Sequence, residues 1–293
     1  MAYALIRGAN IHYEVYGYQG PWFVLTTGGR SGLHRLVSLA ENLSHNGYRV
    51  LLHDRRNTGA SDVAISSDPF EDVMFADDVA ELLTQLDATP AIALGTAAGN
   101  RLCLSLASRH PEKLRGLILC WPVGGRRACE ILAETYYGQY IEVAGDRGME
   151  AVCETPHYAE LIKNNPRNRE LLLSMDTPEF ILTMKRWRET FLASADFPTM
   201  LFSEEQLRAI TLPTCVVPGL IHDPIHGRGT SEAVAALLPN AEVQWLPEER
   251  KPEDDDRGWL LSALDRRADS PELLTIVLDF AARISGTASE ARL

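Results

Sequence analysis

The stretch Ala91-Ile-Ala-Leu-Gly-Thr-Ala-Ala-Gly-Asn100 joins a buried strand to a helix through a run of small residues. Its first half is a continuous apolar run, and a helix-period pattern follows as far as Arg109. Gly95 and Gly99 allow the two backbones to pass closely. The sequence therefore predicts a tight strand-to-helix turn at Ala97.

Strand and helix candidates alternate on both sides of this turn, as in a parallel sheet covered by crossover helices. Each strand candidate is a continuous apolar run, which indicates burial on both faces. Two shorter runs separated by Gly8-Ala9 predict a hairpin near the N-terminus. We expect strands at 3–7, 10–16, 22–27, 49–53, 91–95, 114–120, 214–218 and 242–246, and helices at 33–46, 70–86, 98–109, 231–238 and 271–284.

The alternation stops between residues 123 and 210, where the chain reads as helices only. Because it resumes afterwards, this segment is predicted to be a helical cap inserted into one sheet. The predicted division is an α/β core at 1–122 and 211–293 and a cap at 123–210. Cap side chains that either face a ligand or pack within the cap are Tyr136, Tyr137, Tyr140, His157, Trp187 and Arg188.

Four segments in this order resemble the α/β-hydrolase superfamily. Val24-Leu-Thr-Thr-Gly-Gly-Arg30 stands where the family has the turn that helps to build its oxyanion hole, with Thr27 at a position often held by histidine. Asp54-Arg-Arg-Asn-Thr-Gly-Ala-Ser61 resembles the family's D-x-R-G-x-G-x-S turn, with Asn57 in place of a glycine. Asp54 and Arg56 of that motif are expected to have structural roles.

The other two segments hold the positions of the catalytic groups. Leu94-Gly-Thr-Ala-Ala-Gly-Asn100 lies where the family has its G-x-S-x-G turn, so Ala97 falls on the nucleophile position. Val217-Pro-Gly-Leu-Ile-His-Asp-Pro-Ile-His226 matches the segment of the acid, on which Asp223 falls. The resemblance covers about residues 4–122 and 212–283. It implies an α/β-hydrolase fold, with a mostly parallel eight-stranded sheet flanked by helices and an inserted all-helical cap.

The ordinary mechanism of the family needs two groups that this chain lacks. Acyl transfer requires a nucleophile whose proton is taken by an imidazole, which a carboxylate holds in place. The methyl group of Ala97 cannot attack a carbonyl, and none of the eight histidines follows the last strand. The loop at that place, 247–257, is a charge run typical of a solvated surface. The chain is therefore predicted not to use the Ser–His–Asp mechanism.

The retained turns are nevertheless suited to binding an anion. The N–H of Ala98, at a helix start, and those of the Gly28-Gly29 turn are expected to converge above Ala97. Asp223 is a candidate acid or orienting group, or else the cap of the following helix. His226 is a candidate general base, because the ordinary pKa of histidine suits proton transfer near neutrality, or else a surface residue.

Three more residues are candidates for substrate binding. Trp121, at the tip of a strand, would stack on a flat substrate unless it only fills the core. Thr27 and His222 belong to the two turns described above. The spacing of His222, Asp223 and His226 imposes no shared face, so no metal is expected.

Three functions stay open at this point. The leading hypothesis is a small-molecule enzyme that forms an enolate or oxyanion without a covalent step, as in decarboxylation, elimination, hydration or cyclisation. The second is a hydrolase of esters, lactones or C–C bonds in which alanine has replaced the serine nucleophile at position 97 and a histidine is relocated. The third is a ligand-binding or sensor protein that has lost catalysis.

Composition and charge limit the kinds of binding partner expected for this chain. The formal net charge of −12 disfavours nucleic acid and anionic lipid surfaces. No apolar run approaches the length of a membrane span and no export signal is visible, so we expect a cytoplasmic location. The five scattered cysteines indicate free thiols. The expected partner is a small-molecule substrate or ligand with no cofactor, and a homodimer stays open.

Overall fold

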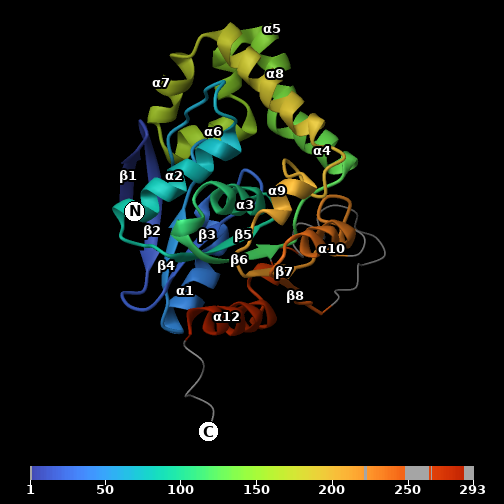
Figure 1. Ribbon diagram of the computed structural model, residues 1–293. Helices are drawn as coiled ribbons and strands as arrows, with labels where there is room; N and C mark the ends of the chain where they lie inside the picture. Colours follow the sequence, from blue (N-terminus) through green and yellow to red (C-terminus); the bar gives the residue numbers. More distant parts are fainter. Residues whose placement is uncertain (1, 221–222, 248–263, 265, 287–293) are drawn as a thin grey trace.

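The computed structural model describes residues 2–220, 223–247, 264 and 266–286 (Figure 1). Within them, eight strands form one sheet in the order β1-β2-β4-β3-β5-β6-β7-β8. β2 is antiparallel to both β1 and β4, and all other neighbours are parallel. The predicted mostly parallel, eight-stranded sheet is confirmed. The strands are β1 Ala2–Ile6, β2 Ala9–Tyr16, β3 Trp22–Thr26, β4 Arg49–His53, β5 Ala91–Thr96, β6 Leu114–Cys120, β7 Thr214–Val217 and β8 Ala241–Val243.

Helices cover both faces of the sheet, and each face has its own hydrophobic core. Successive side chains of β3 alternate between them: Phe23 and Leu25 lie in the core beneath α1 and α12, and Val24 in the core beneath α2, α3 and α10. Burial on both faces explains why the strands read as continuous apolar runs. These elements are η1 Leu33–Leu36, α1 Val37–His45, α2 Glu71–Gln85, α3 Gly99–Arg109, η2 Pro111–Lys113, α10 Arg228–Leu237 and α12 Pro271–Ser285.

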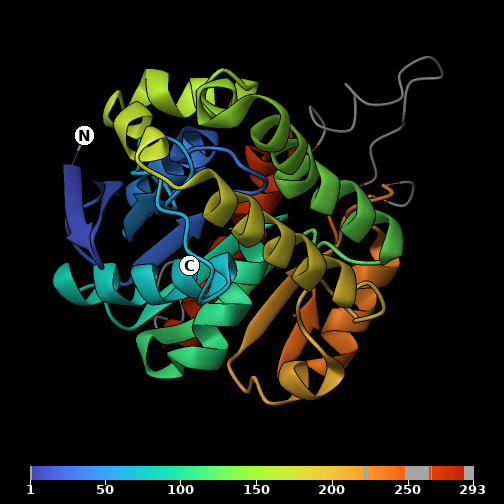
Figure 2. The ribbon, with the colours of Figure 1, turned by 90° about the horizontal axis from the view of Figure 1, so that it is seen from above.

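Between β6 and β7 the chain is helical, and α4 to α8 arch over the sheet (Figures 1 and 2). This layer has a separate core that includes the buried aromatic side chains of Tyr137, Trp187 and Phe191. No helix among the described residues is both long and apolar enough to cross a bilayer. The elements are α4 Arg126–Ala133, the π-helix η3 Glu134–Gly138, α5 Gln139–Cys153, α6 Pro156–Asn164, α7 Arg167–Leu173, α8 Thr177–Ala193 and α9 Glu204–Arg208.

The turn after β4 is organised by charged side chains. The buried Asp54 carboxylate accepts hydrogen bonds from the N–H groups of Leu33, at 2.6 Å, and Ala60, at 2.8 Å. The Arg56 guanidinium binds both carboxylate oxygens of Asp78 in α2, at 2.5 and 2.6 Å. Both side chains tie neighbouring elements together, so the structural role expected for them agrees with the geometry.

The register of the parallel strands brings their carboxyl ends together. Thr26 of β3 pairs with Gly95 of β5, and Thr96 pairs with Cys120 of β6. Cys120 in turn pairs with Val217 of β7. The loops that leave these four strands therefore start side by side, which is where α/β sheets place their ligand sites.

Candidate active site

Ala97 occupies the sharp turn between β5 and α3. Its φ is 48°, in the left-handed region that residues with a Cβ seldom adopt. The Ala97 N–H donates to the carbonyl of Cys120 at 3.0 Å, and the side chain of Asn100 donates to the same carbonyl at 2.8 Å. These contacts hold a conformation that costs on the order of 1 kcal/mol.

Close backbone approach explains the small residues around this turn. A Cβ on Gly99 would lie 2.3 Å from the carbonyl oxygen of Thr26, and one on Gly95 would lie 2.6 Å from the carbonyl carbon of Gly99. A Cβ on Gly28 would lie 2.8 Å from the methyl carbon of Ala97. Glycine is therefore required wherever β3, β5 and α3 meet.

An acid–base pair lies on the loop after β7. Oδ2 of Asp223 is 2.8 Å from Nδ1 of His226, and Oδ1 accepts hydrogen bonds from the N–H groups of Ile225 and His226 at 2.8 and 2.9 Å. Burial by itself would raise the pKa of Asp223, but these hydrogen bonds and the His226 imidazole together hold that pKa below its ordinary value. An ionised carboxylate only accepts, so Nδ1 carries a hydrogen, and in the neutral imidazole Nε2 has the free lone pair.

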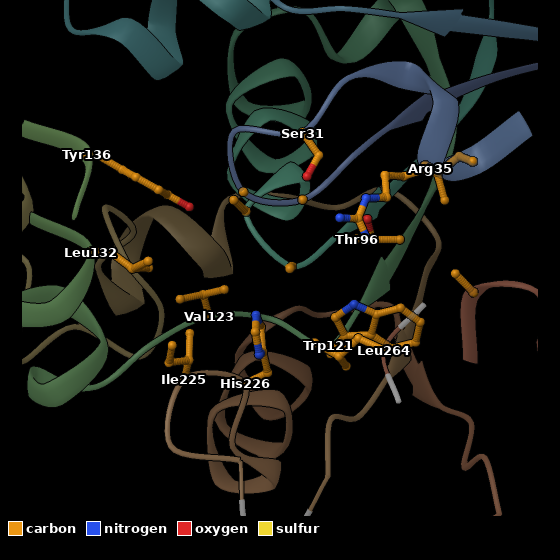
Figure 3. Close-up of a pocket in the computed structure, with 16 residues that line it drawn as sticks. Ser31, Arg35, Thr96, Trp121, Val123, Leu132, Tyr136, Ile225, His226 and Leu264 are labelled. Carbon is orange, nitrogen blue, oxygen red and sulfur yellow. The ribbon is translucent and has the colours of Figure 1, made fainter. Parts of the chain in front are cut away.

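The turn at Ala97 and the loop after β7 both border a cavity of about 240 Å³ beneath the cap (Figure 3). His226, Ser31 and Tyr136 point into it from different elements (Figure 3). The described residues that line it are Gly28, Gly29, Ser31, Arg35, Leu36, Thr96, Ala97, Ala98, Trp121, Val123, Leu132, Tyr136, Ile225, His226, Leu264 and Ala268.

Two backbone N–H groups at this cavity are suited to an oxyanion. Gly29 follows β3 and Ala98 precedes α3, and within the described part of the chain neither N–H has a protein acceptor. The positive end of the α3 dipole adds to the site. The turn itself is fixed because Arg55 donates to the carbonyl of Gly29 at 2.7 Å and the Thr27 hydroxyl donates to the carbonyl of Ser31 at 2.8 Å.

Comparison with known proteins agrees with this geometry. The profile of the α/β hydrolase fold family matches residues 21–135. Two solved structures superimpose on nearly the whole chain. The enol-lactonase from Burkholderia xenovorans has a TM-score of 0.63 and 20% identity over 96% of this chain and 100% of that one. A thermophilic esterase from Thermogutta terrifontis has a TM-score of 0.64 and 19% identity over 97% of this chain and 98% of that one.

The chain has the α/β-hydrolase fold. Its curated relatives include an uncharacterized hydrolase, YraK, of Bacillus subtilis, which is 31% identical over 158 residues. That match spans about half of each protein, 54% of both. A putative carbamate hydrolase, RutD, of Caulobacter segnis is 26% identical over 239 residues, covering 80% of this chain and 87% of that one.

Most of the predicted site residues lie around the cavity. Asp223 stands behind His226, while the hydroxyl of Thr27 is turned to the oxyanion turn and Thr27 is not among the lining residues. His222 and most of the loop 247–257 lie outside the described residues. Those that line the cavity are Gly28, Gly29, Ala97, Ala98, Trp121 and His226.

Of the six cap candidates, Tyr136 alone is among the described lining residues. Tyr137 and Trp187 are buried in the cap core, and Arg188 lies 3.6 Å from Glu134 in an exposed ion pair. Within the described residues, no cluster of His, Cys, Asp or Glu is arranged to hold a metal ion. All five cysteines are free and buried, as predicted.

The sequence did not indicate a largely buried charge network that joins the cap to the Gly28-Gly29 turn. The Arg30 guanidinium binds both oxygens of Glu71 at 2.9 and 3.0 Å, and the Tyr137 hydroxyl donates to the same carboxylate. Arg30 also lies over the ring of Tyr136, 4.9 Å from its centroid. Ser31 and Arg35 were missed as lining residues as well; their only signal is their place just after the Gly28-Gly29 turn.

Proposed function

We propose that this chain is a small-molecule enzyme that transfers protons through His226 to and from a substrate whose oxyanion is bound by backbone N–H groups. The observation that supports it most is the hydrogen bond between Asp223 and His226 at the wall of a cavity whose nucleophile position holds a methyl group. A base and an oxyanion site are present together, whereas a covalent step at residue 97 has no attacking atom.

The proposed step forms an enolate. Nε2 of His226 takes a proton from a carbon next to the substrate's carbonyl, and the electron pair moves to the carbonyl oxygen. The N–H groups of Gly29 and Ala98 hold that oxygen, while Asp223 stabilises the imidazolium. The imidazolium returns its proton to another atom of the substrate or to a leaving group. Elimination, hydration and cyclisation follow this course. In decarboxylation, loss of CO₂ forms the enolate and the imidazolium protonates it.

Product analysis tests this proposal. Wild-type protein and the His226→Gln variant are incubated with small oxo acids, hydroxy acids and lactones, and ¹H NMR follows the products. We expect a product with altered C–C or C–O bonding, formed about 10²–10⁴-fold more slowly by the variant. His34→Gln, which replaces an exposed histidine, is the matched control. Equal rates in wild type and His226→Gln would refute the proposal, as would tight binding of a ligand with no product.

Hydrolysis is the second candidate, because the curated relatives are named as hydrolases. In that reaction a water molecule next to the Ala97 methyl would attack the carbonyl, and His226 would take its proton. In H₂¹⁸O the label would enter the acid product, and intact mass spectrometry during turnover would show no acyl-protein. If serine is the ancestral residue, Ala97→Ser should instead gain a covalent adduct with a fluorophosphonate.

A further inference from the structure

Several of the polar groups among the described lining residues can only donate hydrogen bonds. The N–H groups of Gly29 and Ala98 and the indole of Trp121 can only donate, and the same is true of the Arg35 guanidinium. The remaining polar side chains are hydroxyls and one imidazole. No carboxylate or carboxamide occurs among the described lining residues. Such a wall favours a ligand that is rich in acceptor oxygens.

Arg35 adds a positive charge to this wall. It lies in η1, five residues after the Gly29–Arg30 peptide of the oxyanion turn, and its guanidinium end is turned toward Thr96 (Figure 3). Its side chain is exposed, which places it at the open side of the cavity. Arg35 has another contact in the chain. A guanidinium has enough N–H donors to serve that contact and a ligand together.

The described cavity wall has two positively charged features, although the molecule is acidic overall. The chain has a formal net charge of −12, yet the cavity has Arg35 and the N-terminal end of α3 at its wall. The Asp223 carboxylate, which stands behind His226, is engaged by the imidazole and two backbone N–H groups. A guanidinium and the N-terminal end of a helix at the wall favour an anionic ligand.

We propose that the ligand of this cavity is a small oxo acid. Its carbonyl oxygen binds the N–H groups of Gly29 and Ala98, and its carboxylate binds Arg35. The cavity of about 240 Å³ restricts it to a compact molecule. This inference deepens the proposed function by naming the substrate class, but it concerns binding and does not require turnover.

Calorimetry with a matched pair of probes tests it. 4-Oxopentanoate and 4-oxopentanamide have the same shape, and only the first has a charge. We expect the wild-type protein to bind the acid at least about tenfold more tightly than the amide, because hydrogen bonds to charged groups are the stronger ones. Arg35→Gln should abolish this preference, and Arg35→Lys should keep part of it.

Arg49→Gln is the control, because Arg49 is stacked on Trp22, with its guanidinium 4.4 Å from the ring centroid, and does not line the cavity. Its acid-to-amide ratio should match that of wild type. Equal affinity of the wild-type protein for the two probes, or an unchanged ratio in Arg35→Gln, would overturn the inference. Neither of these results would contradict the proposed proton transfer by His226. If the wild-type protein prefers the acid to the amide but turns over no substrate, the proposed function is wrong and the inference about the ligand still holds.

Discussion

Oδ2 of Asp223 lies 2.8 Å from Nδ1 of His226, three positions later on the same loop. In the α/β-hydrolase superfamily the acid usually follows the next-to-last strand and the histidine follows the last one, so they come from different loops. Here one loop after β7 supplies both. A side chain on Gly219 would lie 1.8 Å from the carbonyl oxygen of His226, so the loop folds back tightly on its own start. The pair is therefore a local unit that does not depend on a histidine after β8.

Replacing Asp223 with asparagine should disable the base without emptying the cavity. The amide can donate to Nδ1, which would move the imidazole hydrogen to Nε2 and leave no lone pair facing the ligand. We expect activity to fall by up to about 10⁴-fold. ¹⁵N NMR of His226 should show hydrogen on Nδ1 in the wild type and on Nε2 in the variant. The same tautomer in both proteins would contradict this view of the pair.

The left-handed conformation of Ala97 should be visible as strain. Ala97→Gly removes the steric cost at φ 48° and is expected to stabilise the fold by about 0.5–1 kcal/mol. Ala98 has φ −59°, so Ala98→Gly should destabilise it by a similar amount. Urea unfolding of both variants gives the comparison. A loss of stability in both would mean that the backbone at residue 97 is not strained.

The Glu71 carboxylate should be important for stability although it lies outside the cavity. Glu71 is 1% exposed and accepts from Arg30 and Tyr137, so Glu71→Gln leaves a largely buried guanidinium without its counter-charge. We expect a loss of about 3–5 kcal/mol. Arg126→Gln, which breaks an exposed pair with Asp196, should cost less than about 1 kcal/mol. Comparable losses in the two variants would contradict the assigned role of the network.

Acid should destabilise the protein through His53. Burial, followed by the nearby Arg55 guanidinium, lowers the pKa of His53 from 6.5 to about 4. The unfolded chain therefore binds the proton first, and stability falls as the pH drops from about 6.5 to 4, by roughly 3 kcal/mol. His53→Gln should reduce this slope, while His34→Gln should not. His157, with a pKa lowered to about 3, keeps part of the slope in both variants.

The sequence predicted those parts of the site that are built from adjacent residues. The turn at Ala97 depends on small residues next to a buried strand, and Asp223 and His226 lie within one short segment. The network of Arg30, Glu71 and Tyr137 depends on contacts across 41 and 66 positions, which no local pattern records. It forms only when the cap packs on the core.

The break between η1 and α1 could not be predicted from the sequence pattern either. The helix predicted at 33–46 is interrupted at Leu36, whose φ of −120° separates the 3₁₀ turn η1 from α1. Residues three apart lie on one side of both helix types over a single turn, and η1 has only four residues, so periodicity could not show the break. That break belongs to the segment in which Arg35 reaches the cavity. A cap residue such as Tyr136 was recognised only as one aromatic among several.

Deuterium exchange tests the central claim most directly. A small oxo acid is incubated in D₂O with wild-type protein, and ¹H NMR follows the loss of the proton on the carbon next to its carbonyl. If His226 removes that proton while Gly29 and Ala98 hold the oxygen, exchange should be at least about 10²-fold faster with the wild type than with His226→Gln. Equal exchange with both proteins would contradict the claim that this site is an acid–base centre.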